Sequence, residues 1–168
     1  MSFGTNYGAL YAEMFPDRVR ALVLDGAVDP ALSVQDVDIQ QANGFGQSLK
    51  AFMDFCAASS SCAFRHGGNP RPAYDALHAR IDREPIRMRN GRVFGPTQLD
   101  IAVAALLYGG RQAYGEIANG LHQLEGGDPS SLLRNFDDYV GRSGSGTYSS
   151  DWAAFIASSC ADGPNLTV

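Results

Sequence analysis

The stretch Val19-Arg20-Ala21-Leu22-Val23-Leu24 is apolar except for Arg20, and Asp25-Gly26 follows it directly. A strand that is apolar on both faces is typical of the centre of a parallel sheet covered by helices on each side. Such a strand needs hydrogen-bonding neighbours along both edges. No second strand of this kind is evident in the chain. We therefore expect a buried strand at 19–24 whose neighbours come from missing core sequence or from a partner chain.

The sequence before this strand predicts a helix and, ahead of it, a sharp turn. Apolar residues recur at helical spacing from Asn6 to Phe15, and Gly8 is small enough for close packing against a sheet. At the chain start, Ser2-Phe3-Gly4 matches the end of the pattern G-x-S-x-G, a strand-to-helix turn that exposes a nucleophilic serine. Such a triplet is common by chance, so its value depends on the helix and strand that follow.

Composition excludes several functional classes. The 168 residues are 45% hydrophobic and 18% charged, which is ordinary for a globular protein with one sizeable core. A net charge of −5 and the lack of a Lys/Arg cluster argue against nucleic acid as a partner. The longest apolar run, Ile101 to Tyr108, is too short to span a bilayer.

The middle of the chain reads as helical. Ser33 and Asp36 resemble a capping box that opens a long amphipathic helix running to about Cys56. Further helical patterns occupy residues 73–82, 98–108, 113–125 and 130–140, and a short helical or extended segment covers 152–158. Between the helices at 73–82 and 98–108, residues 86–94 read as a small hairpin with a type I′ turn at Asn90-Gly91.

Three cysteines leave two readings open. Cys56 and Cys62 flank a loop of small residues that a disulfide could close, or they are two buried thiols. A disulfide would leave Cys160 without a partner and would indicate an oxidising compartment.

The three histidines do not suggest a catalytic or metal site. His66 lies beside a glycine-rich turn, His78 on a charged helix and His122 on a later helix. None has metal-ligand spacing with Cys, Asp or Glu, so we expect no metal and no cofactor. We interpret all three as structural.

Taken together, the chain resembles the lid-bearing α/β-hydrolases of the tripeptidyl aminopeptidase and proline iminopeptidase type, which are chiefly bacterial. The segments that carry the resemblance are Ser2–Thr5, Tyr11–Arg20, Leu22–Gly26 with Asp29-Pro30, Ile117–Leu121 and Ile156–Asp162. The resemblance covers nearly the whole chain and is strongest in the first thirty residues.

The resemblance implies a fragment of an α/β-hydrolase core, comprising the elbow, a helix and one buried strand, followed by a mainly α-helical lid. On this basis residues 1–32 are the partial core, residues 33–157 the lid, and residues 158–168 the start of a return to the core. Secretion or a cell-envelope location is expected from the family and from the disulfide, if it forms.

The resemblance also implies the chemistry. Ser2 corresponds to the nucleophile, and the backbone N–H of Phe3 to one donor of the oxyanion hole. The acid and the histidine of the triad are missing from the chain, so we expect it to be inactive alone. The substrate would be a peptide, for an aminopeptidase, or an ester, for a carboxylesterase or lipase-like enzyme. A non-catalytic helical module that pairs through strand 19–24 is a further alternative.

Overall fold

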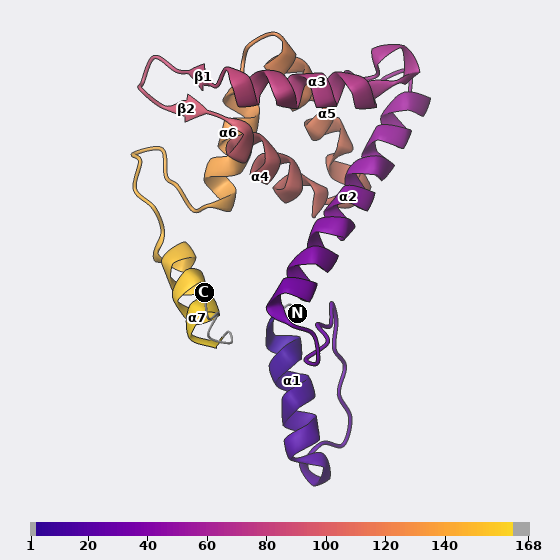
Figure 1. The fold of residues 1–168 in the computed structure, drawn as a ribbon, viewed down its shortest axis with the longest axis vertical. Helices are drawn as coiled ribbons and strands as arrows, with labels where there is room; N and C mark the ends of the chain where they lie inside the picture. Colours follow the sequence, from indigo (N-terminus) through magenta and orange to yellow (C-terminus); the bar gives the residue numbers. More distant parts are fainter. Residues whose placement is uncertain (1–2, 163–168) are drawn as a thin grey trace. The chain divides into compact units, whose positions relative to one another are not determined.

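The computed structural model describes residues 3–162, and these are mainly helical. Contacts divide these residues into two compact units, a first unit up to residue 43 and a second unit from residue 44 onward. The elements, drawn in Figure 1, are α1 (Phe3–Met14), η1 (Pro16–Arg18), α2 (Val34–Ala58), η2 (His66–Gly68), α3 (Pro70–Arg83), β1 (Ile86–Arg87), β2 (Val93–Phe94), α4 (Pro96–Leu107), η3 (Gly110–Ala113), α5 (Tyr114–Glu125), α6 (Ser130–Tyr139) and α7 (Ser150–Asp162).

In the first unit, α1 confirms the helix expected after the elbow, but the predicted buried strand is wrong. Residues 19–24 have no regular secondary structure, and Leu22 and Val23 are 48% and 92% exposed. The physical reason is that this segment lacks neighbouring strands. Its backbone groups need neighbouring strands, and residues 3–162 contain none that pairs with it.

Helix α2 begins where its capping box was predicted. The Ser33 hydroxyl donates to Asp36 Oδ2 at 2.6 Å and accepts the Asp36 backbone N–H at 3.1 Å. These bonds satisfy an N–H group that the first helical turn leaves without an intrahelical partner. The far end of α2 contributes the buried residues Phe52, Met53 and Cys56 to the second unit.

The core of the second unit lies between the end of α2 and helices α3 to α6. Helix α4 is its centre, because it contacts α3, α5, α6 and β2. Its buried face consists of Leu99, Ala102, Val103, Leu106 and Leu107. Figure 1 shows α4 lying among the other helices of this unit.

A glycine allows the closest helix approach in this core. A Cβ atom at Gly120 of α5 would lie 2.8 Å from Cδ2 of Leu132 on α6. That distance is below van der Waals contact, so only glycine lets Leu132 pack this close to the α5 backbone.

The predicted hairpin forms, with a different turn. Strands β1 and β2 pair antiparallel, with Ile86 opposite Phe94 and Arg87 opposite Val93. A type I′ turn needs positive φ at both central residues, yet Gly91 has φ +81° and Asn90 does not have positive φ. The Gly91 N–H donates to the Met88 carbonyl, so the loop is a turn followed by a left-handed glycine. The loop has three residues, 89–91, where a type I′ hairpin has two, so Gly91 lies after the turn centre and not within it.

The Cys56–Cys62 disulfide is present, with Cα atoms 5.2 Å apart, and Cys160 is free and exposed. Cys56 is fully buried in the core. The bridge therefore ties the loop after α2 to the packed interior of the second unit.

A charge network attaches the hairpin to α6. Arg92 donates from both terminal nitrogens to Asp137, at 2.5 and 2.6 Å, and Arg142 lies 3.6 Å from the same carboxylate. All three side chains are less than a quarter exposed. The hydrogen bonds to Asp137 raise the pKa of Arg92. The network therefore joins the hairpin and the chain after α6 to one carboxylate of α6.

Helix α7 confirms that the segment around 152–158 is helical rather than extended. Its described side chains are all exposed, including Trp152, Phe155 and Ile156. A ring contact to the rest of its unit joins Trp152 to Tyr139 at the end of α6, with centroids 6.1 Å apart.

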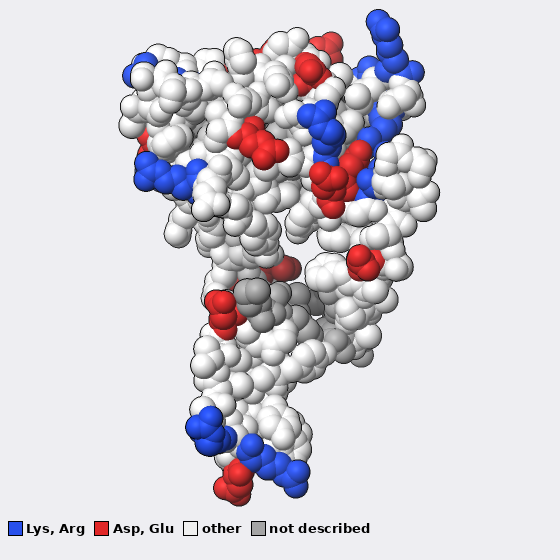
Figure 2. Space-filling model, turned by 180° about the vertical axis from the view of Figure 1, so that it is seen from behind, with Lys and Arg blue, Asp and Glu red and all other residues white. Residues whose placement is uncertain are grey.

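In Figure 2 acidic and basic side chains are interspersed on the face shown, with wide uncharged areas between them.

We expect Asp137→Asn to lower the free energy of unfolding by about 2 kcal/mol, because it leaves two partly buried arginines without a charged acceptor. Urea unfolding followed by far-UV circular dichroism measures this. The matched control is Asp75→Asn, which removes an exposed i,i+4 pair with Arg71 and should cost less than about 0.5 kcal/mol. An equal loss of unfolding free energy in both variants would show that the Asp137 network stabilises the protein no more than an exposed ion pair does.

We expect loss of the disulfide to destabilise the second unit by roughly 2 kcal/mol, since it closes a loop of sequence separation 6. Cys62→Ala is the variant of choice because Cys62 is less buried than Cys56. Adding a reductant to the unaltered protein should lower its unfolding midpoint to that of Cys62→Ala. Ser61→Ala, which keeps the disulfide, is the control and should keep the original midpoint. A midpoint that is insensitive to reductant would show that the bridge does not form.

Candidate active site

The predicted nucleophile Ser2 lies outside the described residues, so the site is characterised through its immediate surroundings. Phe3 is the first residue of α1. The first backbone N–H groups of a helix have no intrahelical acceptor, and they favour negative charge beside them. This is the backbone arrangement that an oxyanion donor at Phe3 requires, and the role itself stays a prediction.

Thr5, in the first turn of α1, ties this turn to the chain beyond Asp25-Gly26. Thr5 is 2% exposed, and its Oγ1 accepts the Val28 backbone N–H at 3.1 Å. Among residues 4–43 it is the only buried side chain. Sequence reasoning missed this contact, because nothing local in the sequence links residues 23 positions apart.

The close packing expected at Gly8 is present, although its partner is not a sheet. A Cβ atom at Gly8 would lie 2.9 Å from Cδ2 of Leu24. Segment 22–24 therefore runs against α1, and any larger residue at position 8 would push the two apart.

Most of the apolar surface of the first unit is uncovered. The large apolar side chains exposed on α1 and just beyond it are Tyr7, Leu10, Tyr11, Met14 and Phe15, together with Leu22 and Val23. An apolar surface this extensive on one short segment is typical of an element that packs against further structure.

The three histidines bind carboxylates on the surface of the second unit. His66 Nε2 lies 3.0 Å from Glu125 Oε1, and His78 Nε2 lies 3.0 Å from Asp100 Oδ1. His122 lies 3.9 Å from the same Glu125. Within residues 3–162 these carboxylates are the only side chains that hydrogen-bond or form ion pairs with the histidines, and no serine hydroxyl bonds to a histidine there. They link neighbouring helices and loops instead.

A buried tyrosine beside the His78–Asp100 pair supports this interpretation. Burial, and secondarily the charge of Asp100, raises the pKa of Tyr74. Tyr74 therefore stays neutral at physiological pH.

The described residues hold no metal cluster and no spanning helix. Among residues 3–162, no group of three or more His, Cys, Asp or Glu side chains could hold a metal ion. In the same range, no helix is long and apolar enough to cross a membrane.

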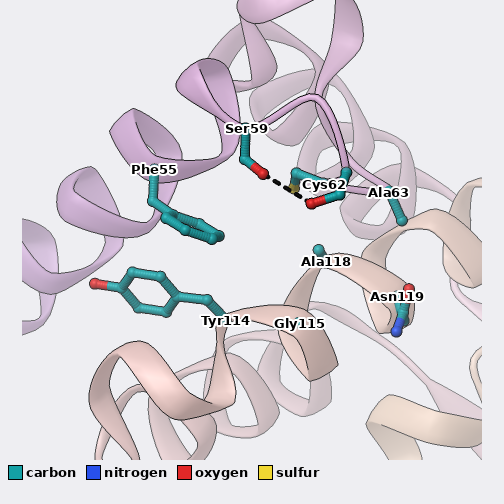
Figure 3. A pocket seen from close by; sticks show the side chains of 9 residues that line it. Phe55, Ser59, Cys62, Ala63, Tyr114, Gly115, Ala118 and Asn119 are labelled. Atoms are coloured by element: carbon teal, nitrogen blue, oxygen red, sulfur yellow. Dashed lines mark hydrogen bonds between the residues drawn. The ribbon is translucent and has the colours of Figure 1, made fainter.

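A small cavity of about 140 Å³ lies beside the disulfide, between the end of α2 and α5. Figure 3 shows the rings of Phe55 and Tyr114 next to each other at one side of it, with centroids 5.3 Å apart. The Ser59 hydroxyl, also on its wall, lies 3.0 Å from that of Ser61. The cavity is lined by serine hydroxyls but by no carboxylate, histidine or free thiol, so its lining supplies no acid or base that could activate a serine.

Comparison with known proteins places these features in a family. Residues 1–66 match the family model described as alpha/beta hydrolase fold. The match begins at the predicted elbow, includes α1 and segment 19–24, and ends beyond the disulfide.

Relatives cover more of the chain. Serine protease Hip1 of Mycobacterium tuberculosis is 30% identical over 99% of the chain and 33% of its own length. Carboxylesterase B of the same organism is 37% identical over 90% of the chain and 29% of its own length. Tripeptidyl aminopeptidase of Streptomyces lividans is 30% identical over 59% of the chain and 18% of its own length. The chain spans about a third or less of these relatives. The family match and the relatives together identify the chain as part of an α/β-hydrolase.

Proposed function

We propose that this chain is the nucleophile-bearing and lid-bearing part of a serine hydrolase, an aminopeptidase that cleaves N-terminal residues or short peptides. The observation that carries the proposal is the family match over residues 1–66, which includes the sequence Ser2-Phe3-Gly4; Phe3 is the first residue of α1. Relatives named serine protease and tripeptidyl aminopeptidase support peptide substrates.

In this proposal the chemistry is acyl transfer. Ser2 attacks the scissile carbonyl, and the Phe3 N–H stabilises the oxyanion that forms. A histidine held by an acid takes the serine proton and returns it to the leaving amine, and water then releases the acyl group. We assign the acid and the histidine to core sequence outside these 168 residues, because in this fold both follow the nucleophile on loops of the central sheet. Residues 3–162 contain only the two-stranded β1–β2 pair and no such sheet.

The proposal assigns residues 1–32 to the partial core, residues 33–157 to the lid and residues 158–168 to the return toward the core. The uncovered apolar residues of α1 and of segment 19–24 support this division, because a partial core lacks its neighbouring strands. The core beginning in α2 supports it too, because it is built from helices and the small β1–β2 hairpin and needs no central sheet.

An esterase is the second candidate, and one observation favours it. Carboxylesterase B shares 37% identity with the chain, more than the two peptidase relatives above. Peptidases and esterases of this mechanism share the serine, the histidine and the oxyanion donors, so the two candidates differ in leaving group and not in the proposed role of Ser2.

We expect Ser2→Ala to reduce turnover by about a thousandfold or more in a chimera that carries this chain in place of the aligned third of carboxylesterase B or Hip1. The assay compares tripeptidyl p-nitroanilides with p-nitrophenyl esters, and the ratio of kcat/KM values separates peptidase from esterase. Ser145→Ala, in an exposed loop, is the control and should retain activity.

The isolated chain should hydrolyse neither substrate. Ser2-dependent hydrolysis by the chain alone would overturn the assignment of the acid and histidine to other sequence. Unchanged activity of the Ser2→Ala chimera would overturn the nucleophile.

We expect Thr5→Val to lower kcat of the same chimera by about tenfold with little change in KM, because the turn that carries Phe3 loses its bond to the Val28 N–H. Thr5→Ser keeps the hydroxyl and should restore kcat. If Thr5 has a purely structural role, thermal stability falls instead. In that case kcat per folded enzyme is unchanged in both Thr5→Val and Thr5→Ser.

A further inference from the structure

A second cavity, of about 370 Å³, lies within the second unit where α6 ends and α7 begins. Its walls come from two segments close in sequence, residues 138–141 and 149–155. The side chains that matter for its chemistry are Asp138, Tyr139, Asp151, Trp152 and Phe155. None of them belongs to the proposed catalytic machinery, and no basic residue lines the cavity.

Three aromatic rings form one wall. Tyr139 and Trp152 meet with centroids 6.1 Å apart and planes inclined by 61°, which makes a corner. Phe155 stacks on Trp152 with centroids 5.4 Å apart. These side chains are 45%, 37% and 59% exposed respectively, so solvent and ligands can reach them. Aromatic faces carry negative electrostatic potential and attract cations.

The charge of the cavity is uncompensated. Within residues 3–162, the carboxylates of Asp138 and Asp151 make no hydrogen bond and no ion pair. The neighbouring Asp137 differs, because Arg92 and Arg142 already neutralise it. Two carboxylates without cationic partners beside three ring faces create a site of negative potential that a bound cation would complete.

We propose that this cavity binds a quaternary ammonium group, such as the trimethylammonium group of choline. A primary ammonium carries three donors that need positioned acceptors, whereas a methylated one is weakly hydrated and is held by ring faces and nearby negative charge. The corner of Tyr139 and Trp152 supplies the faces, and Asp138 and Asp151 supply the charge. The site goes beyond the proposed hydrolase function, because it uses neither Ser2 nor Phe3.

Trp152 is the only tryptophan of the chain, so its fluorescence reports on this cavity directly. Choline chloride is titrated into the purified chain at constant ionic strength, beside its neutral isostere in which a tert-butyl group replaces the trimethylammonium group. We expect a saturable change with choline, with half-saturation on the order of 1 mM, and none with the isostere. No catalysis is needed, so the result is independent of the hydrolase proposal.

Charge variants complete the test. Asp138→Asn and Asp151→Asn should each raise the half-saturating choline concentration about threefold or more. The matched control, Asp82→Asn, removes an exposed carboxylate from α3 and should leave it unchanged. Equal responses to choline and its isostere, or an equal effect of Asp82→Asn, would overturn the site. Tighter binding of Nα-acetyl-lysine amide than of choline would overturn the quaternary ammonium assignment and point to a peptide side chain.

Discussion

Burial of the apolar face of α4 is the interaction on which the described structure depends. Leu99, Val103 and Leu106 lie at the centre of the second unit, and α3, α5, α6 and β2 all contact this helix. Each such side chain contributes roughly 1.5–3 kcal/mol when it leaves water. The peripheral features are attachments to this core: the disulfide fastens the end of α2, Asp137 fastens the hairpin to α6, and Gly120 lets α5 and α6 approach. The lid proposed here can close its own core because helices satisfy their backbone groups internally.

The first unit follows the opposite rule. A central strand cannot satisfy its own N–H and C=O groups, and residues 19–24 accordingly stay irregular and mostly exposed despite their apolar composition. Helix α1 forms, because its hydrogen bonds are local, yet most of its large apolar side chains face solvent. The same asymmetry bears on the proposed function. The proposed oxyanion donor, Phe3, is the first residue of a helix that forms from local hydrogen bonds. The proposed base and acid would instead have to come from distant sequence arranged by a complete sheet.

Predictions from sequence succeeded where the determining interactions are local. The capping box of Ser33 and Asp36, the Cys56–Cys62 bridge and the pairing of residues 86–94 each depend on residues fewer than ten positions apart. The turn type at Asn90-Gly91 was wrong because the register of the two strands, set by burial of Phe94, adds a residue to the loop. The Thr5–Val28 bond, the carboxylate partners of the histidines and the aromatic corner at Trp152 were not predicted, since each joins elements through packing that no local pattern encodes.

The sequence by itself determined the family resemblance, the positions of most helices and the candidate nucleophile, because helix caps, periodicity and short motifs are properties of neighbouring residues. Only the tertiary structure decided which apolar segments are buried. Residues 19–24 and the helix α4 are both apolar in sequence, but α4 is surrounded by helices of its own chain and residues 19–24 have no strand beside them within the described chain. Burial requires a partner surface, and the chemistry of a segment does not specify whether that surface is present.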